Sequence, residues 1–400
     1  MPFSILVGKT RPRRTAIEKT VKKPRNPRIE ALRLVAIVAI AVFHTFQPWF
    51  AAAADASSEL ALSFPWLGNT DCLAFLGWLN LLGAYGNHVF YLISGYFLLP
   101  SAISGRPLRT GRKVMVILVS VLFYATLSLL LGRIVTMESV SLHQTGWLLG
   151  GLEFIWVYLA LVLLTPLMAQ VARKLPQWRR AVLVLAGVVF GLNAYIAFVS
   201  PGEADRGLLE WRKLMSAASY LVAYLTGAAL SYEQARPAKA KRLLVGCILA
   251  SAFIEGGLAA ADSPDLVAAT SFKSTSLLSY LLAVASLAYA RQSTGERVNA
   301  PSWLLAAASS ILGFYISQSM TADIWRPAFE HACARAALAG GAPSLIMCGV
   351  ALSLADVCVV VIFDQLTRSK LLRLLKLSSK APREARGRPQ MPSEPKRRQR

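Results

Sequence analysis

Apolar stretches of about twenty residues, separated by short polar segments, recur along the whole chain. A helix needs about 20 apolar residues to cross the hydrocarbon core of a bilayer. The second stretch is long enough for a helix that is tilted or broken near Gly83 and Gly86. The pattern predicts an all-α polytopic membrane protein with about ten transmembrane helices, over residues 31–49, 71–100, 113–132, 147–172, 181–199, 214–232, 243–260, 274–290, 303–325 and 343–366.

Basic residues are distributed unevenly between the two sides that these helices would define. If successive loops alternate sides, 36 of the 43 Lys and Arg residues fall on one side, and residues 1–33 and 368–400 contribute 10 and 12 of them. Loops rich in Lys and Arg stay in the cytoplasm, so both termini are predicted to be cytoplasmic. The net charge of +22 then reflects topology, and we expect no nucleic-acid partner.

Composition agrees with a membrane domain between two polar ends. The chain is 55% hydrophobic and only 16% charged, whereas a soluble domain needs about a quarter of its residues charged. Residues 1–28 and 368–400 are basic and contain few large apolar residues, so we expect disordered arms that lie against anionic lipid. The expected membrane domain is residues 29–367. Cys and His show no metal-ligand spacing, so neither a metal nor a permanently bound cofactor is expected.

Arg33 and His44 share one face of the first predicted helix. Eleven steps of about 100° bring the two positions to within about 20°, and they are about 16.5 Å apart along the axis. Arg33 would lie at the cytoplasmic end and His44 in the outer half of the membrane. A permanent cation and a proton-exchanging group on one face predict a ligand along this helix. The alternative is an interfacial anchor and a packing histidine.

The second stretch ends in GNHVFYLISGYFLLPS, which places Gly86, Phe90 and Ser94 on one helix face. Small residues at this spacing are typical of closely packed helices, and the same face can also line a substrate cavity. His88 lies just off this face, so it either lines the same cavity or pairs with a neighbouring helix.

The following loop, SAISGRPLRTGRK, contains two overlapping Arg-x-x-Arg spacings. Arg109 and Arg112 would lie about one turn apart at the start of the third helix, on the cytoplasmic side. Such a pair suits the phosphates of a nucleotide. The alternative is that these residues only determine topology.

Glu153 lies six residues inside the fourth stretch, counted from its outer end at Trp147. His44 lies five residues from Trp49, at the outer end of the first stretch. The matching depths predict a carboxylate that orients the imidazole, provided that the two helices are neighbours.

In their order and spacing, these motifs resemble the acyltransferase 3 family of bacterial integral-membrane acyltransferases, in particular the branch of surface-polysaccharide O-acyltransferases. The Arg33-x10-His44 pair, the Gly86-xxx-Phe90-xxx-Ser94 motif and the Arg-x-x-Arg loop carry the resemblance. Two further segments, WVYLALVLLTPLM and SSILGFYISQS, support it.

The resemblance implies a multi-pass enzyme of the bacterial inner membrane that uses acyl-CoA, usually acetyl-CoA, as co-substrate. It would transfer the acyl group to a hydroxyl of a saccharide or glycolipid acceptor, with membrane lipids around it. By similarity, His44 would be catalytic, either as a general base on the acceptor hydroxyl or as the carrier of the acyl group, and Arg33 would assist donor binding. Arg109 and Arg112 would contact the CoA phosphates.

Gln318 departs from the family pattern, because family members often have a histidine at this place in FYISQS. A glutamine can hydrogen-bond but cannot carry a proton near neutral pH. We expect Gln318 to line the substrate cavity, and the change leaves open whether that histidine is dispensable or this branch is inactive. Two other functions also stay open from the residues alone: a transporter or flippase of a glycan or lipid-linked precursor, and a scaffold bound to lipid through its tails.

Overall fold

A computed structural model of the chain describes residues 26–134, 146–199, 209–234, 236–271, 275–292 and 300–377, and the regular elements in these ranges are all helical. The first eight helices are α1 Pro27–Ala54, α2 Glu59–Ser63, α3 Thr70–Ile103, α4 Thr110–Leu131, α5 Gly146–Leu149, α6 Glu153–Lys174, α7 Trp178–Ala194 and α8 Leu209–Leu230. The others are α9 Pro237–Ala260, α10 Pro264–Thr270, α11 Leu277–Ala290, α12 Ser302–Ser309, α13 Ile311–Met320, α14 Ala322–Leu366 and α15 Arg368–Leu374. Two short turns complete them, a 3₁₀ turn at Pro65–Gly68 and a π turn at Tyr195–Val199.

Helix length and hydropathy agree with a multi-pass membrane protein. Within the described ranges, six segments are long and apolar enough to cross a membrane: Pro27–Ala54, Thr110–Leu131, Glu153–Lys174, Trp178–Phe198, Pro237–Ala260 and Ala322–Leu374. The all-α multi-pass prediction is therefore confirmed. The total of about ten spans and the cytoplasmic position of both termini stay predictions.

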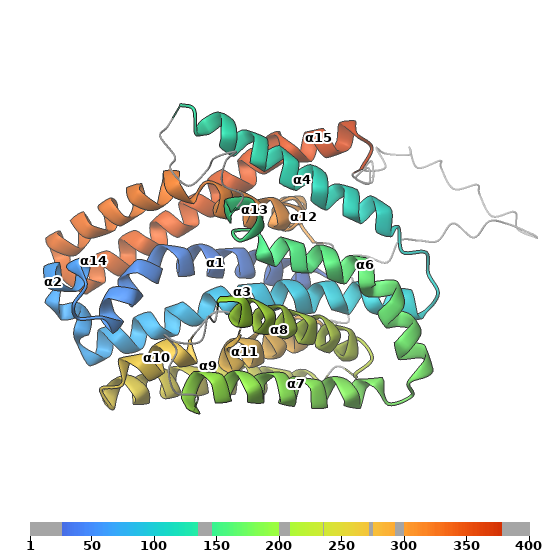
Figure 1. Ribbon diagram of the computed structural model, residues 1–400, viewed down its shortest axis with the longest axis horizontal. Coiled ribbons are helices and arrows are strands. Elements are labelled where there is room, and N and C mark those ends of the chain that lie inside the picture. The colour runs from blue at the N-terminus through green and yellow to red at the C-terminus, as the bar shows by residue number, and fades with distance from the viewer. Residues whose placement is uncertain are drawn as a thin grey trace, which may run out of the picture.

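α1 and α3 run through the middle of the bundle, with α4, α14 and α15 on one side of them and α7, α9, α10 and α11 on the other (Figure 1). α3 is continuous over its 34 residues and is not broken at its glycines. A Cβ added to Gly83 would fall against the ring of Phe43, and one added to Gly86 would fall against Ile40. These glycines allow α1 and α3 to approach closely, which is the packing role expected of small residues at helix contacts.

α8 packs as tightly against the opposite face of α3. A Cβ on Gly95 would overlap the backbone of Tyr224, and a Cβ on Gly227 would overlap the backbone of Leu92. The two backbones therefore touch, and only glycine fits at either position.

The last two predicted spans differ from the observed helices. The predicted ninth span is divided at Ser310 and Thr321 into α12, α13 and the first part of α14. α14 then folds back on itself at Gly340 and Gly341, where Gly341 takes a φ of 64° that favours glycine, so its bounds enclose two segments (Figure 1). The second segment matches the predicted tenth span.

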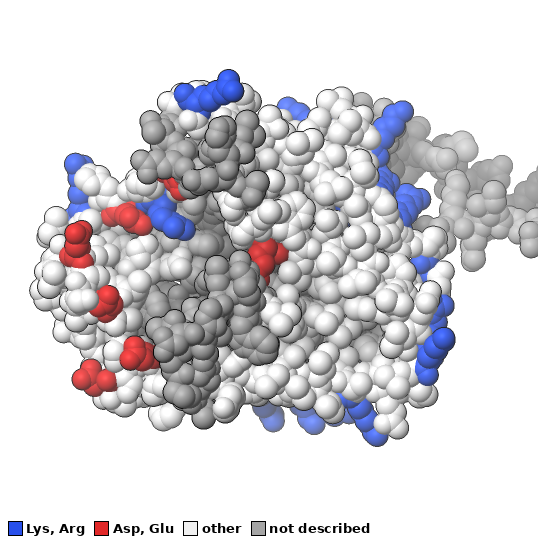
Figure 2. All heavy atoms as spheres, in the orientation of Figure 1, with Lys and Arg blue, Asp and Glu red and all other residues white. Residues whose placement is uncertain are grey.

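Basic and acidic side chains lie mostly at opposite ends of the bundle. Figure 2 shows most Lys and Arg side chains of this face at the end where α4 begins, and most Asp and Glu side chains at the end that carries α2 and α10. We call these the basic end and the acidic end. The separation follows the asymmetry from which we predicted the cytoplasmic side.

The two predicted arms fall largely outside the described residues, which leave out 1–25 and 378–400. The segment 368–377, which the sequence assigns to the C-terminal arm, forms α15 and a turn, and Arg368 is buried. The helical domain therefore extends past the predicted boundary at residue 367.

Candidate functional site

A cavity of about 410 Å³ opens at the basic end of the bundle, and four of the predicted site residues line it together. They are Arg33 of α1, Ser94 of α3, and Arg109 and Arg112 at the start of α4. The structure thus gathers cationic groups from segments that are about 80 residues apart in sequence. The wall also includes Phe97, Lys113, Tyr158 and Leu312, for which no spacing in the sequence predicts a role in this site.

Arg33 is held in place by two neighbours. Its Nη1 donates to Glu30 Oε2 at 2.9 Å, one helical turn earlier, and its guanidinium carbon lies 5.8 Å from the ring centroid of Phe97. Glu30 is buried, whereas the Arg33 side chain is 25% exposed and faces the cavity. The Glu-x-x-Arg spacing of this pair is visible in the sequence and could have identified Glu30 as the partner.

The two arginines of the loop differ in their surroundings. Arg112 donates through Nε to the carbonyl of Leu377 at 2.9 Å and through Nη2 to that of Lys376 at 3.0 Å, so it holds the turn after α15. Arg109 is exposed and lines the cavity, and its side chain makes no hydrogen bond or ion pair with another described residue. Arg109 is therefore the cation most available to an anionic ligand.

Phe90 and Gly86 lie beyond the cavity, at an aromatic cluster between α3, α6 and α13. The Phe90 ring packs against Tyr158 at 4.7 Å and Tyr315 at 5.3 Å between centroids. The Tyr315 hydroxyl donates to the carbonyl of Gly86 at 2.9 Å. The predicted face of Gly86, Phe90 and Ser94 thus points toward these helices, with Ser94 at the cavity and Gly86 in contact with α1.

His44 lies farther along α1, at a junction with α14. It is half-buried, and its ring lies edge-on to Trp325 with centroids 6.3 Å apart. Trp325 Nε1 in turn donates to the main-chain carbonyl of Gln318 at 3.2 Å. Gln318 Nε2 donates to Asp356 Oδ2 at 2.9 Å, so the glutamine found in place of the family histidine is joined to an acidic side chain of α14.

Glu153 is not where the fourth apolar stretch suggests. The helix breaks at Gly150 and Gly151, and Glu153 becomes the first residue of α6 instead of lying about two turns inside a helix. α6 packs against α3, α4 and α8, whereas the ring contacts of His44 are with Phe43 and Trp325. The structure does not bring Glu153 and His44 into contact, and a catalytic role for Glu153 stays a prediction.

His88 lies on the other side of α3. It is fully buried, and its ring is within 6.2 Å of the ring centroids of Phe190, Tyr220 and Tyr280. These residues belong to α7, α8 and α11, so His88 packs with neighbouring helices, which is the second of the two predicted alternatives. It is not part of the wall of the basic cavity.

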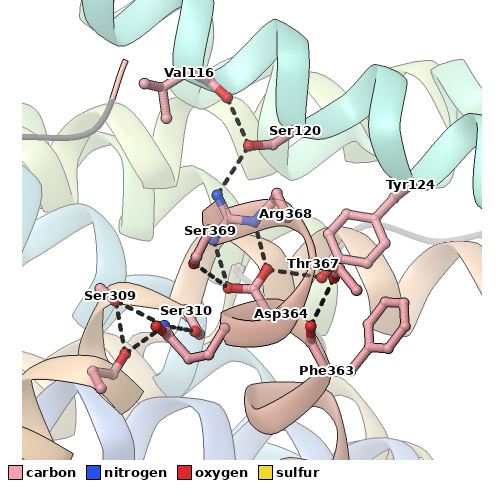
Figure 3. Close-up of polar contacts among 12 residues, drawn as sticks. Val116, Ser120, Tyr124, Ser309, Ser310, Phe363, Asp364, Thr367, Arg368 and Ser369 are labelled. Atoms are coloured by element: carbon pink, nitrogen blue, oxygen red, sulfur yellow. Dashed lines mark hydrogen bonds and ion pairs between the residues drawn. The ribbon is translucent and has the colours of Figure 1, made fainter. Parts of the chain in front are cut away.

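A buried ionic network closes the basic end beside the cavity (Figure 3). Asp364 accepts hydrogen bonds from Arg368 Nη2 at 2.7 Å and from the Tyr124 hydroxyl at 2.8 Å. Arg368 Nη1 donates to Ser120 Oγ at 3.0 Å, which joins α4 to α14 and α15. Because every partner lies within the protein, this network has a structural role and fixes the helix on which Arg109 and Arg112 are carried.

A family model described as an acyltransferase domain, acyltransferase 3, matches residues 26–362. The matched region contains Arg33, His44, Arg109, Arg112 and Gln318. No curated protein and no solved structure matches the chain.

Proposed function

This chain belongs to the acyltransferase 3 family, and from that premise we propose that it is an O-acyltransferase of the bacterial inner membrane. The proposed donor is a cytoplasmic acyl-CoA such as acetyl-CoA. The proposed acceptor is a hydroxyl of an envelope or exported saccharide, free or lipid-linked.

One observation carries the choice of donor: the cavity at the basic end combines Arg33, Arg109 and Arg112 with apolar and aromatic side chains of α3, α4 and α6. Guanidinium groups bind phosphates in a bidentate geometry, and a cluster of them suits the phosphates of CoA. Arg33 and His44 share a face of α1 and are about 16.5 Å apart along the axis. A donor held by its phosphates at the cavity would extend its thioester arm along this face toward His44.

His44 supplies the group that the transfer needs. As a general base, the imidazole takes the proton of the acceptor hydroxyl while the hydroxyl oxygen attacks the thioester carbonyl carbon. The tetrahedral intermediate then expels the CoA thiolate, which takes the proton back from the imidazolium. An ester forms, a thioester breaks, and His44 returns to its starting state.

The exchange of the family histidine for Gln318 is compatible with this scheme. Only one proton-exchanging group is required, and His44 provides it. The Gln318 amide is fixed by Asp356 and can orient a hydroxyl by hydrogen bonding without titrating.

The test is acyl transfer by purified protein and by cells that carry His44→Ala. We expect loss of saccharide acylation with normal membrane insertion, because no other described histidine lies on this face of α1. His331→Ala, at an exposed position of α14, is the matched control and should retain activity. Full acylation by His44→Ala would remove His44 from the mechanism, and movement of a glycan without covalent change would favour a transporter.

A further inference from the structure

Three residues that contact the indole of Trp325 each carry a buried polar atom without a hydrogen-bond partner in the described part of the chain. These atoms are His44 Nδ1, Gln318 Oε1 and Arg326 Nε. The His44 ring lies edge-on to Trp325 at 6.3 Å, and the Arg326 guanidinium carbon is 5.8 Å from the indole centroid. The main-chain carbonyl of Gln318 accepts a hydrogen bond from the indole N–H. We call these four residues the Trp325 subsite.

The three atoms belong to three different helices, α1, α13 and α14. A distortion of one helix therefore does not explain why all three atoms have no hydrogen-bond partner. Buried polar groups are nearly always hydrogen-bonded, and each exception calls for an explanation. Groups that meet at one place and all lack a partner are explained together when one ligand supplies the missing bonds.

Gln318 shows which kind of group the ligand must offer. Its Nε2 donates a hydrogen bond to Asp356. The atom without a partner is therefore the side-chain carbonyl oxygen Oε1, which only accepts hydrogen bonds. A hydroxyl is a donor that fits such an oxygen. Asp356 is then a positioning residue, because it keeps the amide from turning its NH₂ group toward the ligand.

Arg326 shows that the ligand also carries negative charge. Its guanidinium is always ionised, and it forms no ion pair or hydrogen bond with any residue that the structure describes. Arg326 is half-buried beside Trp325, whose ring also contacts His44, and neither of these neighbours carries negative charge. An anionic group of the ligand would therefore supply a counter-charge for Arg326.

We propose that the Trp325 subsite binds the acceptor and that the acceptor is an acidic saccharide, with a carboxylate or phosphate held by Arg326. The hydroxyl to be acylated donates to His44 Nδ1, which takes its proton, and a neighbouring hydroxyl of the same saccharide donates to Gln318 Oε1. This inference rests on the proposed acyl-CoA-dependent function and adds the chemical class of its acceptor.

The experiment compares acceptors with purified full-length protein and labelled acetyl-CoA. Methyl β-glucuronoside and glucose 6-phosphate are the anionic probes, and methyl β-glucoside is the neutral one. We expect kcat/KM to be about tenfold or more higher for an anionic probe, and the better of the two identifies the anion. Equal use of neutral and anionic probes, or no use of the anionic ones, would overturn the proposal.

Variants then locate the preference. Arg326→Gln should raise KM for the anionic probe about tenfold or more and change KM for the neutral probe much less. Arg335→Gln, at an exposed position of the same helix, is the matched control and should leave both KM values unchanged. Asp356→Asn should raise the acceptor KM without changing the KM for acetyl-CoA.

Two further outcomes separate this inference from its premise. If Arg326→Gln slows hydrolysis and transfer equally through kcat, Arg326 stabilises the tetrahedral intermediate and does not recognise the acceptor, which overturns the proposal. If the unmodified protein turns over no acetyl-CoA with water or any probe, the proposed function itself is wrong.

Discussion

Gly313 of α13 lies directly against the carboxylate of Asp364 in α14, so closely that a Cβ added to Gly313 would overlap Oδ1. Asp364 has no room to withdraw, because it is fully buried and is held by Arg368 and the Tyr124 hydroxyl. The glycine of the SSILGFYISQS segment therefore makes room for the ionic network shown in Figure 3.

Gly313→Ala should consequently destabilise the protein strongly. Overpacking a rigid site costs about 1–3 kcal/mol, and displacing a buried ion pair adds to that cost. The measurement is the thermal unfolding midpoint of detergent-solubilised protein, with the loss of folded protein on heating detected by size-exclusion chromatography. Gly187→Ala in α7, where a Cβ would meet nothing within 4 Å, is the control and should leave the midpoint unchanged or slightly higher. Equal midpoints for both variants would show that α13 can shift away from α14.

Asp364→Asn should lower the free energy of unfolding more than simultaneous replacement of Asp364 and Arg368 by apolar residues does. The single change leaves the buried Arg368 without its counter-charge, which costs about 3–5 kcal/mol, whereas apolar replacement of a whole buried pair is often neutral. We expect the double variant Asp364→Leu with Arg368→Met to recover part of the loss in the same thermal assay. Simple addition of the two single effects would argue against a coupled pair.

The helices were predictable from the sequence because their signal is local. Each predicted apolar stretch overlaps one or more observed helices, and charge asymmetry appears again as the basic and acidic ends. The interpretation of individual residues was harder where it depended on partners far away in the chain. Gly83 and Gly86 suggested a possible break in α3, and only the close approach of α1 shows that they serve packing.

The candidate site was predictable in part for the same reason. Arg33, Arg109 and Arg112 carry a family spacing and meet at one cavity. Arg326 directly follows the predicted span 303–325, and hydropathy alone cannot show that it packs on Trp325, whose ring also contacts His44. Arg368 was placed in a basic arm, although the four-residue spacing from Asp364 was a visible sign of an ion pair on one helix.

Arg109→Gln and Arg112→Gln should weaken acyl-CoA binding in different ways. The Arg109 side chain makes no hydrogen bond with another described residue, so its loss should reduce affinity about tenfold at low salt with unchanged thermal stability. Arg112 holds the carbonyls of Lys376 and Leu377, so its loss should also lower the unfolding midpoint.

Titration of acetyl-CoA into each variant at low and at high salt checks this prediction. Arg106→Gln, in the same loop but not in the cavity wall, is the control for general loss of positive charge. Unchanged affinity in Arg109→Gln would exclude it from a phosphate site.

Glu255 of α9 is a buried acidic residue that the proposed chemistry does not use. It is fully buried, and neither carboxyl oxygen has a hydrogen-bond partner in the described ranges. It faces Gly77 of α3, where an added Cβ would lie 3.0 Å from Oε2. A buried polar group without a partner costs about 1–3 kcal/mol, so Glu255→Met, which keeps the volume, should leave the unfolding midpoint unchanged or raise it.

Activity separates a packing role for Glu255 from a functional one. The residue lines neither the basic cavity nor the Trp325 subsite, so we expect acetyl-CoA turnover by Glu255→Met to equal that of the unmodified protein. Glu59→Met, which removes an exposed carboxylate at the acidic end, is the matched control for the change in charge and should alter neither quantity. If Glu255→Met is more stable and yet inactive, the carboxyl of Glu255 is retained for function at the expense of stability. The general reason is that an unpaired buried polar group persists only where selection maintains it.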